Sequence, residues 1–144
     1  MTMNSQQQLG HIDQQGVNEH ILVVDDDLNL CQTIQIVLEE EGFMVETALD
    51  GVEALELVER MQPAMVVLDM GLPLLDGEAV AKELRVRYGE TVPVVLMTAD
   101  GHVMEKGQRV GAVVSLGKPF EIDDLVNAVH KALAPKGGEG EVQS

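Results

Sequence analysis

Short apolar runs alternate with longer stretches of helical period along this chain, and this alternation restricts its fold more than any other feature. The runs lie at residues 21–24, 45–48, 65–68, 92–97 and 113–116. Their length is typical of buried strands, and the stretches between them carry apolar residues three and four positions apart, as helices do. Five strand-helix units of this kind predict an α/β fold, a doubly wound parallel sheet with helices on both faces.

Residues that start helices support this interpretation. Asp27 precedes the first helical stretch, and Asp50 with Glu53 forms a capping-box pattern at the second. Asp76-Gly77 predicts a turn and the start of the third. We expect the remaining two helices at about 102–110 and 122–133.

The domain organisation follows from length and composition. A chain of 144 residues has room for one core of ordinary size. Residues 1–18 are polar and Gln-rich, and residues 135–144 begin with Pro and several Gly, so both are expected to be flexible. The folded domain is therefore predicted to span residues 19–134.

Charge and cysteine content exclude several classes of protein. The net charge of −16 would repel a nucleic-acid backbone, and no basic cluster offsets it. The single cysteine, Cys31, excludes an intramolecular disulfide. No apolar stretch has the length of a signal peptide or a membrane span. We expect a soluble cytoplasmic protein that binds neither nucleic acid nor membrane.

Polar residues of three chemical types stand at the ends of the predicted strands. Ligands of doubly wound sheets bind beyond the carboxyl ends of the strands, so chemistry is expected there. The residues are Asp25, Asp26 and Asp27 after the first strand, Asp69 after the third, Thr98 after the fourth and Lys118 after the fifth.

A hard divalent cation would relieve repulsion among clustered carboxylates. If the first and third strands are neighbours, Asp25, Asp26 and Asp69 form such a cluster. Its oxygen donors suit Mg²⁺ better than Zn²⁺, because no Cys or His accompanies them. An ionised Asp69 could attack phosphorus and form an acyl phosphate, while Lys118 and the Thr98 hydroxyl would stabilise the transferred group.

Each of these residues also has an ordinary structural interpretation. Asp27 is expected to cap the first helix. Asp25, Asp26 and Asp69, each taken alone, are equally compatible with solvated turn positions. Thr98 alone could be a strand-end hydroxyl, and Lys118 alone a surface cation. Their joint occurrence at the ends of different strands favours a functional site.

Several motifs together resemble the receiver domain of two-component response regulators, over about residues 21–133. Residues 21–27 resemble the first strand and acidic pair of that family. Residues 66–73 with Asp76-Gly77 resemble its phosphoacceptor strand and loop. Residues 93–99 carry its hydroxyl position on Thr98, and Gly111-Ala112 followed by Lys118-Pro119-Phe120 carries its lysine.

The resemblance implies a flavodoxin-like sheet of order 2-1-3-4-5 and phosphorylation of Asp69 by a histidine kinase or a histidine phosphotransfer protein. It implies Mg²⁺ bound by the side chains of Asp26 and Asp69 and by the Gly71 carbonyl, with Asp25 acting mainly through water. It also implies a cis Lys118-Pro119 bond.

One position departs from the family pattern. Receivers usually carry Tyr or Phe three residues before the lysine, as a switch that turns inward on phosphorylation, and here that position is Ser115. We therefore do not expect the usual aromatic read-out at this position. Gly71 and Asp100 occupy the positions where the family tunes the lifetime of the acyl phosphate.

The leading hypothesis is a stand-alone receiver, similar to the chemotaxis regulators, that changes protein partners when phosphorylated and acts as a monomer or a phosphorylation-dependent dimer. It would not be an enzyme beyond Mg²⁺-dependent self-phosphorylation and slow autodephosphorylation. A degenerate receiver acting as an unphosphorylated scaffold and a receiver fragment of a longer regulator remain alternatives. A phosphatase of the haloacid-dehalogenase type would need an acidic residue two positions after Asp69, where this chain has Gly71, so this alternative is disfavoured.

Overall fold

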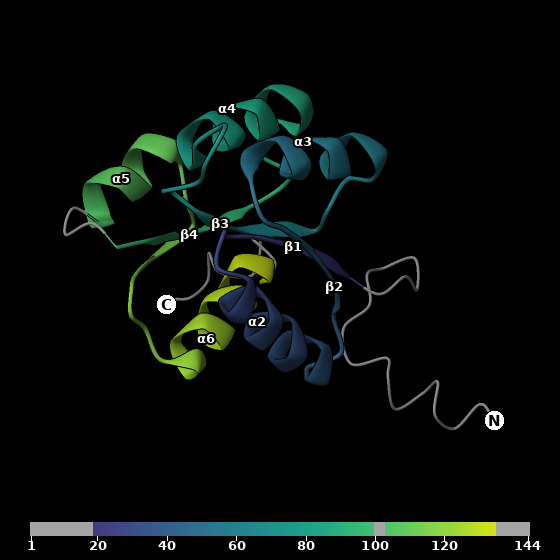
Figure 1. The fold of residues 1–144 in the computed structure, drawn as a ribbon, viewed down its shortest axis with the longest axis vertical. Helices are drawn as coiled ribbons and strands as arrows, with labels where there is room; N and C mark the ends of the chain where they lie inside the picture. Colours follow the sequence, from purple (N-terminus) through teal and green to yellow (C-terminus); the bar gives the residue numbers. More distant parts are fainter. Residues whose placement is uncertain (1–18, 100–102, 135–144) are drawn as a thin grey trace.

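The computed structural model describes residues 19–99 and 103–134 as a parallel sheet between two layers of helices (Figure 1). The strands are β1 (His20–Val24), β2 (Met44–Ala48), β3 (Met65–Asp69), β4 (Val94–Thr98) and β5 (Val114–Gly117). The helices are α2 (Leu28–Glu40), α3 (Gly51–Arg60), α4 (Gly77–Tyr88), α5 (Val103–Val110) and α6 (Ile122–Leu133). The expected flexible ends, 1–18 and 135–144, lie outside the described residues.

The strand order is β2-β1-β3-β4-β5, and every neighbouring pair is parallel. This confirms the predicted flavodoxin-like fold and its order. Because all strands run in one direction, their carboxyl ends meet at a single edge of the sheet. Asp25, Asp69 and Thr98 lie at this edge.

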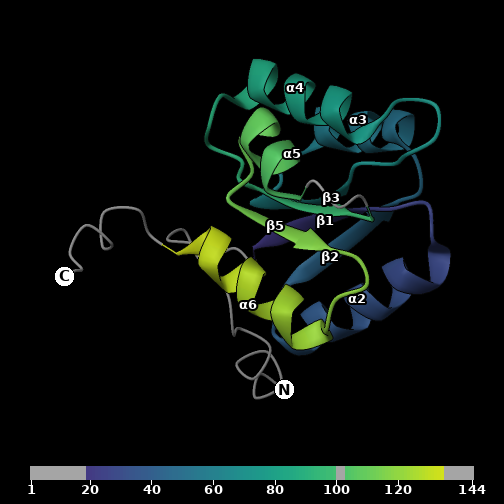
Figure 2. The same cartoon turned by 90° about the vertical axis from the view of Figure 1, so that its left-hand side faces the viewer.

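Helices cover both faces of the sheet, with α3, α4 and α5 on one side and α2 and α6 on the other (Figures 1 and 2). Alternate strand residues face the two helical layers. Leu22, Val66 and Leu96 belong to the core under the first layer. Ile21 and Val67 belong to the core under the second. Both cores consist mainly of aliphatic side chains.

The predicted helix starts at three aspartates are confirmed. The carboxylates of Asp27, Asp50 and Asp76 each accept a hydrogen bond from the backbone N–H three residues later, at 3.1, 2.8 and 2.9 Å. Glu53 returns a bond to the Leu49 N–H at 3.0 Å, one residue before the expected partner of a capping box.

All five strands differ from the prediction by one or two residues at one or both ends, and β1 and β2 each begin one residue earlier than expected. β4 begins at Val94 rather than at residue 92, because Pro93 has no N–H to donate to the ladder. β5 begins at Val114, one residue later than expected. β3 and β4 each end one residue later than predicted, so Asp69 and Thr98 are the last residues of these strands and do not follow them. Their backbones are held by the sheet itself.

Two further expectations concern the helices. The fourth predicted helix is α5, which begins at Val103, while His102 lies outside the described residues. Within the described ranges, no helix has the length and apolar character needed to span a membrane.

Candidate functional site

Three carboxylates converge at the carboxyl edge of the sheet. Asp25 and Asp26 directly follow β1, and Asp69 ends the neighbouring β3. Single oxygens of the three side chains all lie within 4.8 Å of one another. Asp25 is fully buried and Asp69 is 6% exposed, whereas Asp26 is exposed. The cluster is therefore open to solvent on the side of Asp26.

Lys118 reaches this cluster from the loop after β5. Its Nζ lies 2.6 Å from Asp25 Oδ2 and 3.3 Å from Asp69 Oδ1. The Lys118 N–H donates to the Thr98 carbonyl at 2.8 Å, and the Lys118-Pro119 bond is cis, as the resemblance implied. The ammonium thus bridges the two buried acids.

Burial and charge act against each other on these groups. Desolvation by burial, followed by the charge of Asp25, raises the pKa of Asp69, although Lys118 and the Gly71 N–H oppose this. Burial acts to lower the pKa of Lys118, but the hydrogen bond and charge of Asp25 and Asp69 outweigh it and raise that pKa. Asp69 therefore loses its proton at a higher pH than an ordinary aspartate does, and Lys118 keeps its positive charge.

The donor set fits a hard divalent cation. Three carboxylates face one ammonium, so a negative excess remains for a cation to neutralise. The group found among the described residues consists of oxygen donors alone, the type that Mg²⁺ prefers. Gly71 lies beside the cluster, since an added Cβ there would have only Asp69 Oδ2 within 4 Å, at 3.9 Å.

Asp25 has a role in this arrangement that sequence reasoning missed. One of its oxygens accepts from the Asp27 N–H at 2.9 Å and the other bonds Lys118. The Asp25 carbonyl accepts from the Cys31 thiol at 3.2 Å. Both carboxylate oxygens are thus engaged by the protein, and no sequence pattern indicated the pairing with Lys118.

Gly77 is a second residue whose part in the site the sequence did not reveal. The prediction treated it as a turn residue. A Cβ at this position would lie 2.3 Å from the Asp69 carbonyl oxygen and 2.8 Å from Met70 Cα. The first turn of α4 therefore packs directly on the backbone that carries Asp69, and only glycine allows this approach.

Thr98 and Ser115 lie on the α5 side of the sheet. Thr98 is 3% exposed and pairs in register with Gly117, while Ser115 pairs with Leu96. A Cβ added to Gly107 of α5 would lie 2.0 Å from Ser115 Oγ. Ser115, where receivers usually carry an aromatic residue, is thus in close contact with a helix. Asp100 lies outside the described residues.

Residues 21–130 match the response regulator receiver domain. The chain therefore belongs to the response regulator receiver domain family. It is similar to sporulation initiation phosphotransferase F of Bacillus subtilis, with 35% identity over 83% of this chain and 98% of that protein.

Other relatives are longer. The response regulator MprA of Mycobacterium leprae is 40% identical over 78% of this chain but only 50% of its own length, so this chain spans about half of it. Among solved structures, the response regulator TrrA of Thermotoga maritima, in complex with Mg(2+)-BeF, superposes with a TM-score of 0.72 at 33% identity, over 80% of this chain and 99% of that one.

Proposed function

We propose that this protein is a phosphoacceptor of a two-component system, which takes up a phosphoryl group on Asp69 and signals by changing its protein partners. The observation that carries the proposal is the position of the Asp69 carboxylate, which lies within 4.8 Å of two further acids and 3.3 Å from the Lys118 ammonium. The phosphoryl donor would be a phosphohistidine of a histidine kinase or of a phosphotransfer protein.

In the reaction, an Asp69 carboxylate oxygen forms a bond to phosphorus while the bond from phosphorus to the histidine nitrogen breaks. The leaving imidazole keeps the electron pair and is protonated from solvent. Lys118 is already within reach of Asp69, so its charge can stabilise the transferred oxygens. Thr98, at the end of the next strand, would donate its hydroxyl to the same group.

A Mg²⁺ ion would be held by the side chains of Asp26 and Asp69 and the Gly71 carbonyl, with Asp25 acting through water. When bound, the ion would neutralise the charge of the phosphoryl oxygens. The engagement of both Asp25 oxygens by Lys118 and the Asp27 N–H supports its indirect part. The Mg(2+)-BeF complex of the TrrA structure supports the choice of ion.

The protein would act in the cytoplasm as a stand-alone receiver, not as an enzyme with its own turnover substrate. The match over 98% of the sporulation phosphotransferase supports a stand-alone receiver. The match over only half of MprA supports the alternative of a receiver from a longer regulator. Sedimentation of the phosphorylated protein would distinguish a monomer from a phosphorylation-dependent dimer.

The test is intact-mass analysis after incubation with acetyl phosphate, with and without Mg²⁺. We expect the wild-type chain to gain one hydroxylamine-labile phosphoryl group only with Mg²⁺, and Asp69→Asn to gain none. Asp50→Asn, at the helix-cap aspartate of α3 outside the cluster, is the matched control and should be modified normally. A labile acyl phosphate retained in Asp69→Asn would contradict the assignment of the site.

A chain that binds Mg²⁺ but gains no phosphoryl group would favour the unphosphorylated scaffold. In that event the contact between Ser115 and Gly107 becomes the feature to examine, because it is where this chain departs from the family pattern.

A further inference from the structure

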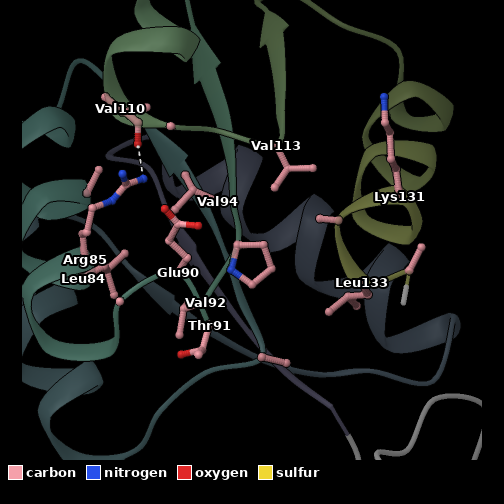
Figure 3. Close-up of a pocket in the computed structure, with 17 residues that line it drawn as sticks. Leu84, Arg85, Glu90, Thr91, Val92, Val94, Val110, Val113, Lys131 and Leu133 are labelled. Atoms are coloured by element: carbon pink, nitrogen blue, oxygen red, sulfur yellow. Dashed lines mark hydrogen bonds between the residues drawn. The ribbon is translucent and has the colours of Figure 1, made fainter. Parts of the chain in front are cut away.

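A pocket of about 1060 Å³ lies at the amino ends of β3, β4 and β5, at the opposite edge of the sheet from Asp69. Its walls come from the ends of α4, α5 and α6 (Figure 3). The aliphatic lining includes Val92, Val94, Val110, Val113 and Leu133.

The pocket is open and mainly apolar, with charges at its margin. Val113 is 43% exposed even though it lies beside the buried Val94. Arg85 on one wall donates to the Val110 carbonyl at 3.3 Å, and Lys131 stands on the opposite wall (Figure 3). With Glu90, these are the charged groups of the lining. Val92, Val94 and Val110 are at most 7% exposed, so they form the floor of an open pocket with a mainly apolar lining, which is a candidate binding site.

The chain before β1 enters the fold beside this pocket. Ala64, one of the lining residues, donates its N–H to the His20 carbonyl at 2.7 Å. His20 is the first residue of β1, so the described chain begins at the edge where the pocket opens, and residues 1–18 precede this point in the sequence. Residues 1–18 also include three aliphatic side chains, at Leu9, Ile12 and Val17.

The segment is long enough to reach every part of the pocket. Three strand spacings separate β1 from β5, roughly 14 Å in all. The eight residues from Ile12 to His20 span up to about 26 Å when extended. Asp13, next to Ile12, would meet a margin that carries two cations and one acid.

We propose that residues 1–18 dock in this pocket, with Leu9 and Ile12 against its aliphatic lining. The segment after α6 is a weaker occupant, although it leaves from Ala134 at the pocket edge. Residues 135–144 contain three Gly and Val142 as the one large aliphatic side chain, so they offer little apolar area.

The native cysteine makes a direct test practicable. Cys31 is fully buried, and burial raises its pKa to about 11, so the folded chain should take up a thiol-directed spin label only at an introduced cysteine. We would label Gln7→Cys in the full chain and record amide signal intensities by NMR. The expected result is loss of intensity at Val92, Val94 and Val113, with none at Leu28 or Leu74 near the acidic edge.

Variants in the segment decide whether the contact is apolar. Leu9→Ser with Ile12→Ser should restore the pocket signals, whereas the matched pair Gln8→Ser with Gln14→Ser should leave them weakened. The proposal is overturned if the pocket signals keep full intensity, or if the Leu9 and Ile12 changes do not restore them. It is equally overturned if the loss arises only between labelled and unlabelled molecules, or only from a label at Gln143→Cys.

Discussion

The two edges of this sheet are built from opposite kinds of side chain. At the carboxyl edge, the buried carboxylates of Asp25 and Asp69 share one ammonium, from Lys118. At the amino edge, Val92 and Val94 line an open pocket whose charges stand at the margin. The same strands therefore place buried charge at one end and accessible apolar surface at the other.

This difference shows that a parallel sheet can carry its charged functional groups at one edge and an apolar pocket at the other. The carboxylate pair exists because β1 and β3 are neighbours, although their aspartates are far apart in the sequence. Buried like charges are tolerated only with a counter-charge, so the acidic edge should be sensitive to any change in charge or backbone position. The pocket edge should tolerate comparable changes.

The largest effect is expected from Gly77→Ala. The added Cβ would collide with the Asp69 carbonyl, and overpacking against backbone should lower the free energy of unfolding by about 3 kcal/mol. Gly89→Ala, toward the pocket edge, meets no atom within 4 Å and has only its φ of 63° to oppose it, so about 1 kcal/mol is expected. Urea unfolding measures both. Equal losses of unfolding free energy in the two variants would show that the first turn of α4 does not pack closely on the Asp69 backbone.

A somewhat smaller loss is expected from Lys118→Ala. It leaves the fully buried Asp25 without its counter-charge, and about 2–3 kcal/mol should be lost, less than for a wholly buried pair because Lys118 is 22% exposed. Because the fold raises the pKa of Lys118, its contribution is present below the ordinary lysine pKa and disappears as pH rises through the raised value.

Lys131→Ala provides the comparison at the pocket edge, where Lys131 is exposed. Its loss should stay within about 0.5 kcal/mol. Denaturant titrations of both lysine variants at neutral and strongly alkaline pH would check the magnitude and the pH dependence. A Lys118→Ala protein as stable as Lys131→Ala would mean that the bridge contributes nothing.

The smallest change is a gain in stability from Asp69→Asn in the absence of divalent cations. The fold raises the pKa of Asp69, so its favourable contribution is present below the ordinary aspartate pKa and is lost as pH rises through the raised value. The amide should therefore raise Tm at neutral pH and have little effect in acid.

Glu90→Gln makes the same change of charge on an exposed residue of the pocket and should leave Tm nearly unchanged at either pH. Thermal unfolding with a chelator present measures the difference. Added Mg²⁺ should then stabilise the wild-type chain more than Asp69→Asn. An Asp69→Asn variant less stable than the wild type at neutral pH, without divalent cations, would contradict the direction of the pKa shift.

Local signals in the sequence predicted much of this structure. Aspartates before each helical stretch marked real caps, as at Asp50, because capping depends on residues only three positions apart. Strand ends with acids located the carboxylate cluster, because parallel strands end at one edge. Pro93 moved the start of β4, which the apolar pattern alone had placed two residues early.

Contacts that depend on the path of a loop or on packing distances were beyond the reach of these signals. Lys118 was expected to face the transferred group, and its 2.6 Å bond to Asp25 depends on the path of the loop after β5. The contact of Gly77 with the Asp69 backbone and the pocket depend on how far apart helices and strands pack. Such distances are set by side chains on several elements at once.

The contact between Gly107 and Ser115 has a consequence for exchanging parts between receivers. The spacing of a helix from a sheet is set by the bulk between them, and beside Gly107 the Ser115 side chain occupies the position of an added Cβ, which would lie 2.0 Å from its Oγ and 3.2 Å from its Cβ. Positions 107 and 115 therefore form a matched pair. In a chimera that takes α5 from a protein with a larger residue at position 107, we expect α5 to shift away from β5 unless β5 comes from the same donor.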